Sequence, residues 1–356
     1  MGLRSFVELQ KTGGEIVMCK KIFVAQYNGI GDAIVNAPLI LSMMDAPDVN
    51  KIFLCSNDMW IFLKNIIDKY NKLFLLPRNY RSLEFISNLQ YFFHSNEITD
   101  IISYRRDEIK NPHFYKQYMD VLQANNMLLH CYEHKLSEQH IMDLHFYDLG
   151  RMLTILSGNF NPPESLQGWM NKYYPFNGIC NRQSVGIYLG ASVQNKRLKP
   201  NVWVEIVNLL IDRGKQPIFL RAITAEEKSY EDTIFGLLGS KMNNCHIIFI
   251  SDFDALIDSL LHQMCGLVSC DTFIVHLAVS LNVKVFGIYI STDSKIYGPI
   301  ADGSASYQSQ SFYSCEFRNK WGNCNSWGSC KRMGCVDGIN KDELTFYFNE
   351  WLNQLY

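Results

Sequence analysis

The stretch 184–203, SVGIYLGASVQNKRLKPNVW, contains a strand, a glycine turn, a basic loop and the start of a helix. Residues 184–189 form a short apolar run that favours a β-strand. Pro200 suits the first turn of a helix, where its missing amide hydrogen is not needed. A strand that leads through a loop into a helix is the repeating unit of a parallel sheet. The stretch therefore predicts an α/β domain.

The same alternation extends in both directions from this stretch. Short apolar runs separated by helix-like segments precede it and follow it. This pattern predicts doubly wound sheets, in which ligands bind beyond the carboxyl ends of the strands. The predicted strands are residues 21–27, 51–55, 72–76 and 99–104 in the first half, and 184–189, 216–221, 246–251, 266–270 and 284–290 in the second.

The length of the chain and a break in the pattern predict two domains. A chain of 356 residues exceeds one ordinary core. A helical pattern over 142–158 ends at Gly158, and a linker is expected at 159–182. Residues 341–355 carry apolar side chains on one helical face and predict a closing helix. We expect domains at 1–175 and 176–338, with the closing helix in 339–356.

Composition and charge exclude several classes of protein. Lysine plus arginine (33) nearly balance aspartate plus glutamate (35), and the net charge of −2 gives no positive field for nucleic acid. No window approaches the roughly 18 uninterrupted apolar residues that span a bilayer, so membrane contact is expected to be peripheral. The odd number of cysteines, eleven, and the lack of an apolar signal segment in 1–20 predict a cytoplasmic protein.

One candidate site follows the first strand, in residues 28–38, NGIGDAIVNAP. Its two glycines allow another molecule to approach the backbone closely, and Asp32 stands at the start of the next helix, where a carboxylate is favourable. Asp32 therefore either faces a ligand or only caps the helix. The segment lacks the third glycine of the dinucleotide-binding fingerprint.

A second candidate site is the basic loop that follows residues 184–189. It gathers Ser192, Lys196, Arg197 and Lys199 just before the helix that Pro200 opens. Such a loop suits a diphosphate because it follows a core strand, although its composition alone fits a solvated loop near a helix end better.

A third candidate site is the segment 269–276, SCDTFIVH, which follows another predicted strand. Asp271 and Thr272 precede a helix that carries His276 one turn in. The free amides at the start of such a helix attract phosphate oxygens. Taken singly, Asp271 and Thr272 also fit a simple helix cap, and His276 fits an ordinary core residue.

Taken together and in order, these segments resemble glycosyltransferase family 9, the ADP-heptose:lipopolysaccharide heptosyltransferases. The resemblance spans both predicted domains. It is carried by Gly31, Asp32 and Pro38; by Gly190, Ala191, Ser192, Lys196 and Arg197; by Asp271, Thr272, His276, Ser291–Asp293, Gly298 and Pro299; and more weakly by His145, Asp148, Leu153 and Gly158.

The resemblance implies a GT-B fold, in which two Rossmann-like doubly wound domains face a central cleft. The first domain would bind the acceptor and the second a nucleotide-sugar donor. By the same resemblance Asp32 is the catalytic base and Lys196 contacts the donor phosphates. Gly31, Ser192, Asp271, Thr272 and His276 would help to bind the donor, and Glu226 or Glu227 would bind its ribose.

The implied reaction is transfer of a heptose or related sugar from an ADP-sugar to a hydroxyl group, with inversion and without a catalytic metal. The implied acceptor is the lipopolysaccharide or lipooligosaccharide core, and the alternative is serine on an autotransporter adhesin. Phe273 departs from the family, which has glycine there. A catalytically inactive nucleotide-sugar-binding protein and a sugar-nucleotide epimerase therefore stay open as alternatives. The acceptor-binding residues are unknown.

Four cysteines near the C-terminus form a separate candidate site. Cys315, Cys324, Cys330 and Cys335 lie within a short window, and such a density of thiolates suits zinc or iron. The spacing contains no CxxC pair, so free buried cysteines fit equally well. Some protein-directed members of the family carry a cysteine-ligated iron at a similar place, which implies a structural metal here. The resemblance also allows an oligomer and contact with the inner membrane.

Overall fold

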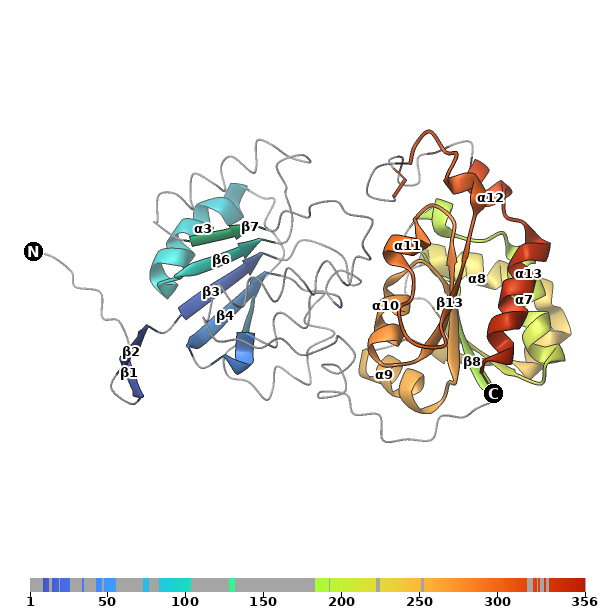
Figure 1. Ribbon diagram of the computed structural model, residues 1–356, viewed down its shortest axis with the longest axis horizontal. Coiled ribbons are helices and arrows are strands. Elements are labelled where there is room, and N and C mark those ends of the chain that lie inside the picture. The colour runs from blue at the N-terminus through green and yellow to red at the C-terminus, as the bar shows by residue number, and fades with distance from the viewer. Residues whose placement is uncertain are drawn as a thin grey trace, which may run out of the picture. The chain divides into compact units, whose positions relative to one another are not determined.

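The computed structural model describes two compact units, which are treated separately below (Figure 1). The first unit contains residues 1–135 and 145–163, and the second contains residues 136–144 and 164–356. Within them the structure describes residues 9–12, 15–18, 20–25, 34, 43–46, 48–55, 73–76, 83–103, 128–131, 183–191, 193–221, 225–250, 253–318, 323–324, 326, 330 and 333–355.

The described part of the first unit is built on a five-stranded parallel sheet. Its strand order is β5-β4-β3-β6-β7, so the chain starts in the middle and reverses direction between β3 and β6. The strands are β3 (Lys20–Ala25), β4 (Val49–Cys55), β5 (Leu73–Leu76), β6 (Asp100–Ser103) and β7 (Leu128–Cys131), and helix α3 (Leu83–Asn96) precedes β6. An antiparallel hairpin of β1 (Leu9–Thr12) and β2 (Glu15–Met18) comes first.

The second unit repeats this plan with a six-stranded parallel sheet of order β10-β9-β8-β11-β12-β13. This is the order of a Rossmann-type sheet, and its direction reverses between β8 and β11. The loops that follow these two strands therefore leave the sheet side by side. The strands are β8 (Ser184–Tyr188), β9 (Gln216–Arg221), β10 (His246–Phe249), β11 (Gly266–Cys270), β12 (Lys284–Tyr289) and β13 (Ala305–Gln308).

Helices connect the strands of the second unit. Pro200 occupies the first turn of α7, as its fixed φ favours. The Asn340 side chain caps α13 by accepting hydrogen bonds from the amides of Asp342 and Glu343. The helices are α7 (Pro200–Asp212), α8 (Ala225–Leu238), α9 (Phe253–His262), α10 (Phe273–Ser280), α11 (Ser294–Tyr297), α12 (Gly334–Asp337) and α13 (Lys341–Asn353), with 3-10 turns η1 (Gln194–Lys196), η2 (Gly239–Asn244) and η3 (Gln310–Phe312).

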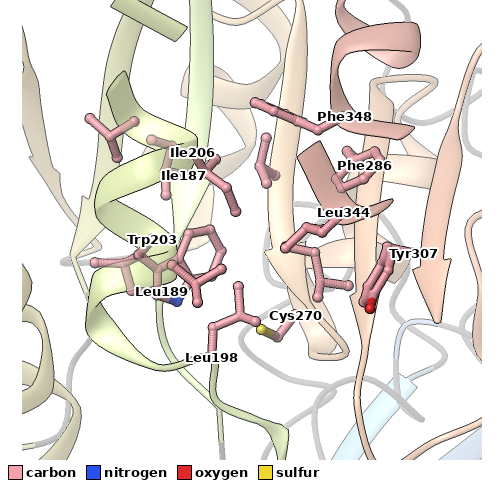
Figure 2. Close-up of a cluster of buried hydrophobic side chains, with 14 of the residues drawn as sticks. Ile187, Leu189, Leu198, Trp203, Ile206, Cys270, Phe286, Tyr307, Leu344 and Phe348 are labelled. Carbon is pink, nitrogen blue, oxygen red and sulfur yellow. The ribbon is translucent and has the colours of Figure 1, made fainter. Parts of the chain in front are cut away.

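The core of the second unit lies between the sheet and the helices α7 and α13 (Figure 2). Trp203 of α7 is fully buried against strand residues such as Ile187. Phe286 of β12 packs on two aromatic residues of α13, with ring centroids 5.1 Å from Phe348 and 5.7 Å from Trp351. The C-terminal helix is therefore part of this core.

The structure confirms the predicted parallel α/β sheets and each predicted strand to within a few residues. The amphipathic helix expected at 341–355 is α13. The β1–β2 hairpin, β7 and β13 were not predicted. The sequence of β13, ASYQ, is mostly polar and gives no apolar run to recognise. The helix expected at 142–158 and the linker at 159–182 lie outside the described residues. None of the helices in the described part of the chain combines the length and apolarity needed to cross a bilayer.

Replacing Phe348 with alanine is expected to lower the free energy of unfolding of the second unit by about 3–5 kcal/mol, because the cavity would remove ring contacts with Phe286 and Trp351. The matched control is Phe346→Ala on the same helix, where the side chain is 61% exposed and the change should be within about 0.5 kcal/mol. Urea unfolding followed by tryptophan fluorescence measures both. Equal losses would contradict the described packing of α13.

Candidate functional site

Lys196 and Asp271 meet where the second sheet reverses direction. Lys196 lies in the loop after β8, and Asp271 directly follows β11. The Nζ atom of Lys196 lies 2.5 Å from Oδ2 of Asp271, although 75 residues separate them in sequence. The crevice beyond the carboxyl ends of strands at such a reversal is the usual ligand site of an open parallel sheet. The two sequence-predicted segments are thus brought together.

Asp271 is a buried carboxylate held by several polar groups. Its Oδ2 atom accepts hydrogen bonds from Lys196 Nζ and from Thr292 Oγ1, the latter at 2.8 Å. Burial alone would raise the pKa of Asp271, but the charges of Lys196 and His276 and these hydrogen bonds together hold it below the usual value. Asp271 is therefore an anion at neutral pH, and it fixes the position of the Lys196 ammonium.

Arg197 shapes the loop that carries Lys196. Its guanidinium is buried, and it donates to the carbonyl oxygen of Ala191 through Nε at 3.1 Å and Nη2 at 2.8 Å. The remaining Nη1 donates to Glu226 at 2.9 Å, and the group lies over the ring of Tyr230. Arg197 thus closes the loop onto itself, and the neighbouring Lys196 points toward Asp271.

The start of α10 forms another part of the site. Thr272 is its N-cap residue, but the Thr272 side chain makes no capping hydrogen bond with the described first turn. Thr272 Oγ1 instead lies 3.3 Å from Ser269 Oγ. The positive end of the α10 dipole thus lies beside Asp271 and Lys196, and such a helix start attracts an anion such as a phosphate oxygen. His276 is buried and lowers the pKa of Asp271 from within the same helix.

Two aromatic residues flank these polar groups and were not singled out as a pair by the sequence. Tyr188, the last residue of β8, meets Phe273 edge to face, with ring centroids 5.8 Å apart. Burial, and then the charges of Glu227 and Glu231, raise the pKa of Tyr188, which is therefore neutral. A side chain at Gly190 would place its Cβ 2.7 Å from the Tyr188 hydroxyl and 2.8 Å from Glu227 Oε1, so Tyr188 and Glu227 would have to shift to admit it.

The loop after β12 lies beside the cysteine-containing segment. Asp293 caps α11 and accepts a hydrogen bond from Arg318 Nη2 at 2.9 Å. Thr292 forms an isolated antiparallel bridge with Asn323, next to Cys324. Arg318 therefore links this segment to Asp293. The preceding residue, Thr292, is the one whose hydroxyl donates to Asp271. Sequence inspection missed Arg318, which belongs to none of the predicted motifs.

The predicted cysteine residues do not form a ligand set in the described structure. Burial, followed by the nearby thiols of Cys315 and Cys324, raises the pKa of Cys335 to about 11, so these three lie in one neighbourhood. Cys324 Sγ lies 2.9 Å from Ser326 Oγ. Within the described residues, no three His, Cys, Asp or Glu side chains converge as metal ligands. The metal site at Cys315, Cys324, Cys330 and Cys335 stays a prediction.

Of the remaining residues predicted from the sequence, the structure describes some and not others. Gly31, Asp32 and Ser192 lie outside the described residues. Glu226 and Glu227 both lie in the first turn of α8, where Glu226 pairs with Arg197. Their role toward a ribose stays a prediction.

Replacing Asp271 with asparagine is expected to cost about 3–5 kcal/mol of unfolding free energy at pH 7, because it removes the counter-charge of a mostly buried lysine. Since the pKa of Asp271 is lowered in the folded state, this stabilisation is complete above the unfolded value of about 4 and is lost as the pH falls through the folded value. The difference between wild type and variant should therefore shrink as the pH falls below about 4 in urea titrations.

The matched control is Asp337→Asn, which breaks the exposed pair between Asp337 and Lys199. That change should cost no more than about 1 kcal/mol. A cost for Asp271→Asn that is independent of pH would mean that the ion pair does not stabilise the fold.

Comparison with solved structures shows the same fold over the whole chain. The E. coli heptosyltransferase WaaC with ADP matches with a TM-score of 0.59 and 11% identity, over 93% of this chain and 99% of that chain. A family 9 glycosyl transferase from Veillonella parvula matches with a TM-score of 0.63 and 13% identity, over 94% and 98%. E. coli ADP-heptose LPS heptosyltransferase II matches with a TM-score of 0.59 and 13% identity, over 94% of this chain and 99% of that chain. No curated protein matches the sequence significantly.

A match of sequence accompanies this likeness of fold. Residues 161–320 match the family described as glycosyltransferase family 9 (heptosyltransferase). The matched span contains the loop of Lys196, the paired Asp271 and the start of α10. The match supports the resemblance for the motifs at 190–197 and 271–299, which lie within the matched span. The chain therefore has the GT-B fold of solved heptosyltransferases, and residues 161–320 are similar in sequence to glycosyltransferase family 9.

Proposed function

We propose that the chain transfers a heptose from ADP-heptose to a hydroxyl acceptor, with inversion at the anomeric carbon. The observation that carries the proposal is the Lys196–Asp271 pair at the reversal point of the second sheet, beside the start of α10. A fixed cation next to helix amides is an arrangement that stabilises a diphosphate. Two E. coli heptosyltransferase structures support the donor, because they were solved with ADP and with ADP-2-deoxy-2-fluoro heptose.

The proposed reaction is a direct displacement. Asp32 removes the proton from the acceptor hydroxyl as its oxygen attacks the anomeric carbon, and the bond from that carbon to the β-phosphate oxygen breaks. The bonding electrons leave with ADP, whose terminal phosphate gains negative charge. Lys196 and the first amides of α10 stabilise that charge, since oriented charges and dipoles act most strongly where charge develops. Asp271 and Thr292 keep Lys196 in place for this role.

Asp271 performs a different task from Asp32 in this proposal. Its oxygen Oδ2 is already shared by Lys196 and Thr292, and its pKa is lowered. A carboxylate with those properties is a weak base, which suits an anchor better than a proton acceptor. The base is therefore assigned to the first unit, through the family resemblance of Asp32.

The proposed acceptor is the lipopolysaccharide or lipooligosaccharide core. E. coli ADP-heptose LPS heptosyltransferase II has the same fold and is named for that substrate. An acceptor in the lipopolysaccharide core would place the enzyme in the cytoplasm, with peripheral contact at the inner membrane. The second candidate is serine on an autotransporter adhesin. Incubating the enzyme and ADP-heptose separately with each acceptor, and weighing the products by mass spectrometry, distinguishes them.

Replacing Asp32 with alanine is expected to reduce transfer at least 1,000-fold, on the order of the loss of a general base, while ADP-heptose still binds. Lys196→Ala should weaken both ADP binding and transfer, because the anchor for the phosphates is removed. Calorimetry with ADP-heptose and a transfer assay measure the two effects separately.

The control for Lys196 is Lys199→Ala in the same loop. Lys199 is exposed and pairs with Asp337, so its loss should leave donor affinity and transfer within about twofold of wild type. Full activity of Asp32→Ala would refute the assignment of the base. Donor binding without transfer to any acceptor would instead favour an inactive nucleotide-sugar-binding protein, and conversion of the donor alone would favour an epimerase.

Treatment with EDTA is expected to leave transfer within about twofold of the untreated rate, since the proposed charge stabilisation uses Lys196 and helix amides. Metal analysis of the same samples tests the predicted structural zinc or iron on the cysteines. A loss of transfer that is restored by Mg²⁺ or Mn²⁺, with the protein still folded by circular dichroism, would contradict metal-independent catalysis.

A further inference from the structure

Phe273 occupies an unusual place beside the proposed donor site. It is the first residue of α10 and directly follows Asp271 and Thr272. Every later residue of the helix, from Ile274 to Ser280, is buried, whereas Phe273 is only partly buried. Part of this large apolar ring is therefore accessible at the start of the helix.

The direction of the Phe273 side chain follows from helix geometry. In an α-helix each Cα–Cβ bond tilts toward the N-terminus, so the side chain of the first residue overhangs the helix start. This is the positive end of the α10 dipole, next to the Lys196–Asp271 pair. The ring of Phe273 therefore borders the space that a ligand on those amides would occupy.

Contact with Tyr188 holds the Phe273 ring in position. The rings meet edge to face at an interplanar angle of 74°, a favourable aromatic geometry. Tyr188 is itself buried at the end of β8, and Gly190 leaves room for its hydroxyl. A ring supported in this way is fixed before a ligand binds, which lowers the entropy cost of contact.

The chemistry of the donor indicates which part Phe273 would touch. The diphosphate is attracted to Lys196 and the helix amides, and the negative face of an aromatic ring gives it no stabilisation. A sugar ring, in contrast, presents C–H groups that can pack against an aromatic surface, and this contact removes both surfaces from water. The sugar is joined directly to the phosphate at the helix start, so it lies within reach of a side chain there.

We propose that Phe273 is a specificity-determining residue that packs against the sugar of the donor and favours the nucleotide-sugar over the free nucleotide. The inference rests on the proposed function, since it requires a donor diphosphate at Lys196 and α10. Phe273 thus acts as one wall of the sugar pocket, supported by Tyr188, rather than as an obstruction to the phosphates.

The test is to titrate full-length wild type, Phe273→Leu and Phe273→Ala with ADP and with ADP-heptose by calorimetry. For both variants we expect the affinity for ADP to stay within about twofold and the affinity for ADP-heptose to fall about tenfold, because the ring surface that packs against the sugar is lost. Leucine keeps apolar volume and removes the ring. Phe273→Tyr should restore the wild-type ratio, and Phe346→Ala, an exposed aromatic residue on α13, should leave it unchanged.

The outcomes separate this inference from the proposed function. Tighter binding of both ligands to the variants would show that the ring obstructs the phosphates, and equal weakening of both would show a purely structural role; either result overturns the inference. A wild type that binds ADP-heptose, with a ratio unchanged in the variants, overturns the inference alone. A wild type that binds neither ligand overturns the proposed function and the inference with it.

Discussion

The ion pair between Lys196 and Asp271 is the interaction on which the site depends. It joins the loops after β8 and β11, the two strands between which the sheet reverses direction. A lysine in that crevice without a counter-charge would lose much of its hydration, and a buried carboxylate alone would lose more. Each charge therefore compensates for the hydration that the other loses on burial. The second hydrogen bond, from Thr292, adds the loop after β12 to the same point.

The division of work between adjacent basic residues follows from this pair. The planar guanidinium of Arg197 donates hydrogen bonds to the Ala191 carbonyl and to Glu226. Its several donors in one rigid plane suit contacts in these fixed directions. Lys196 carries one compact charge on a flexible stem and reaches Asp271. The backbone of the loop is set by the arginine, and the charge offered to a ligand is set by the lysine. With lysine at 197 and arginine at 196, neither the contacts that hold the loop backbone nor the compact charge beside Asp271 would be retained.

Sequence alone predicted more of the fold than of the site. Buried parallel strands such as β8, SVGIY, are continuous apolar runs and are recognisable locally, whereas β13, ASYQ, acquires its strand structure from pairing with β12. The loops of Lys196 and Asp271 were correctly expected at the carboxyl ends of strands. That Lys196 faces Asp271, and that Arg197 turns inward, depends on strand order and burial across 75 residues, which no local pattern contains. The positions of Gly31, Asp32 and Ser192 lie outside the described residues.

The place of α13 in the core has a consequence for biosynthesis. Phe348 and Trp351 follow all the described strands in the sequence, yet they cover Phe286 of β12, the strand that pairs with β11 and β13. On the ribosome, the strands and the paired loops emerge well before the side chains that seal them. Until the last helix leaves the exit tunnel, the nascent second unit exposes an aromatic surface. Completion of this core therefore waits until α13 has been synthesised, so the second unit cannot finish folding strand by strand.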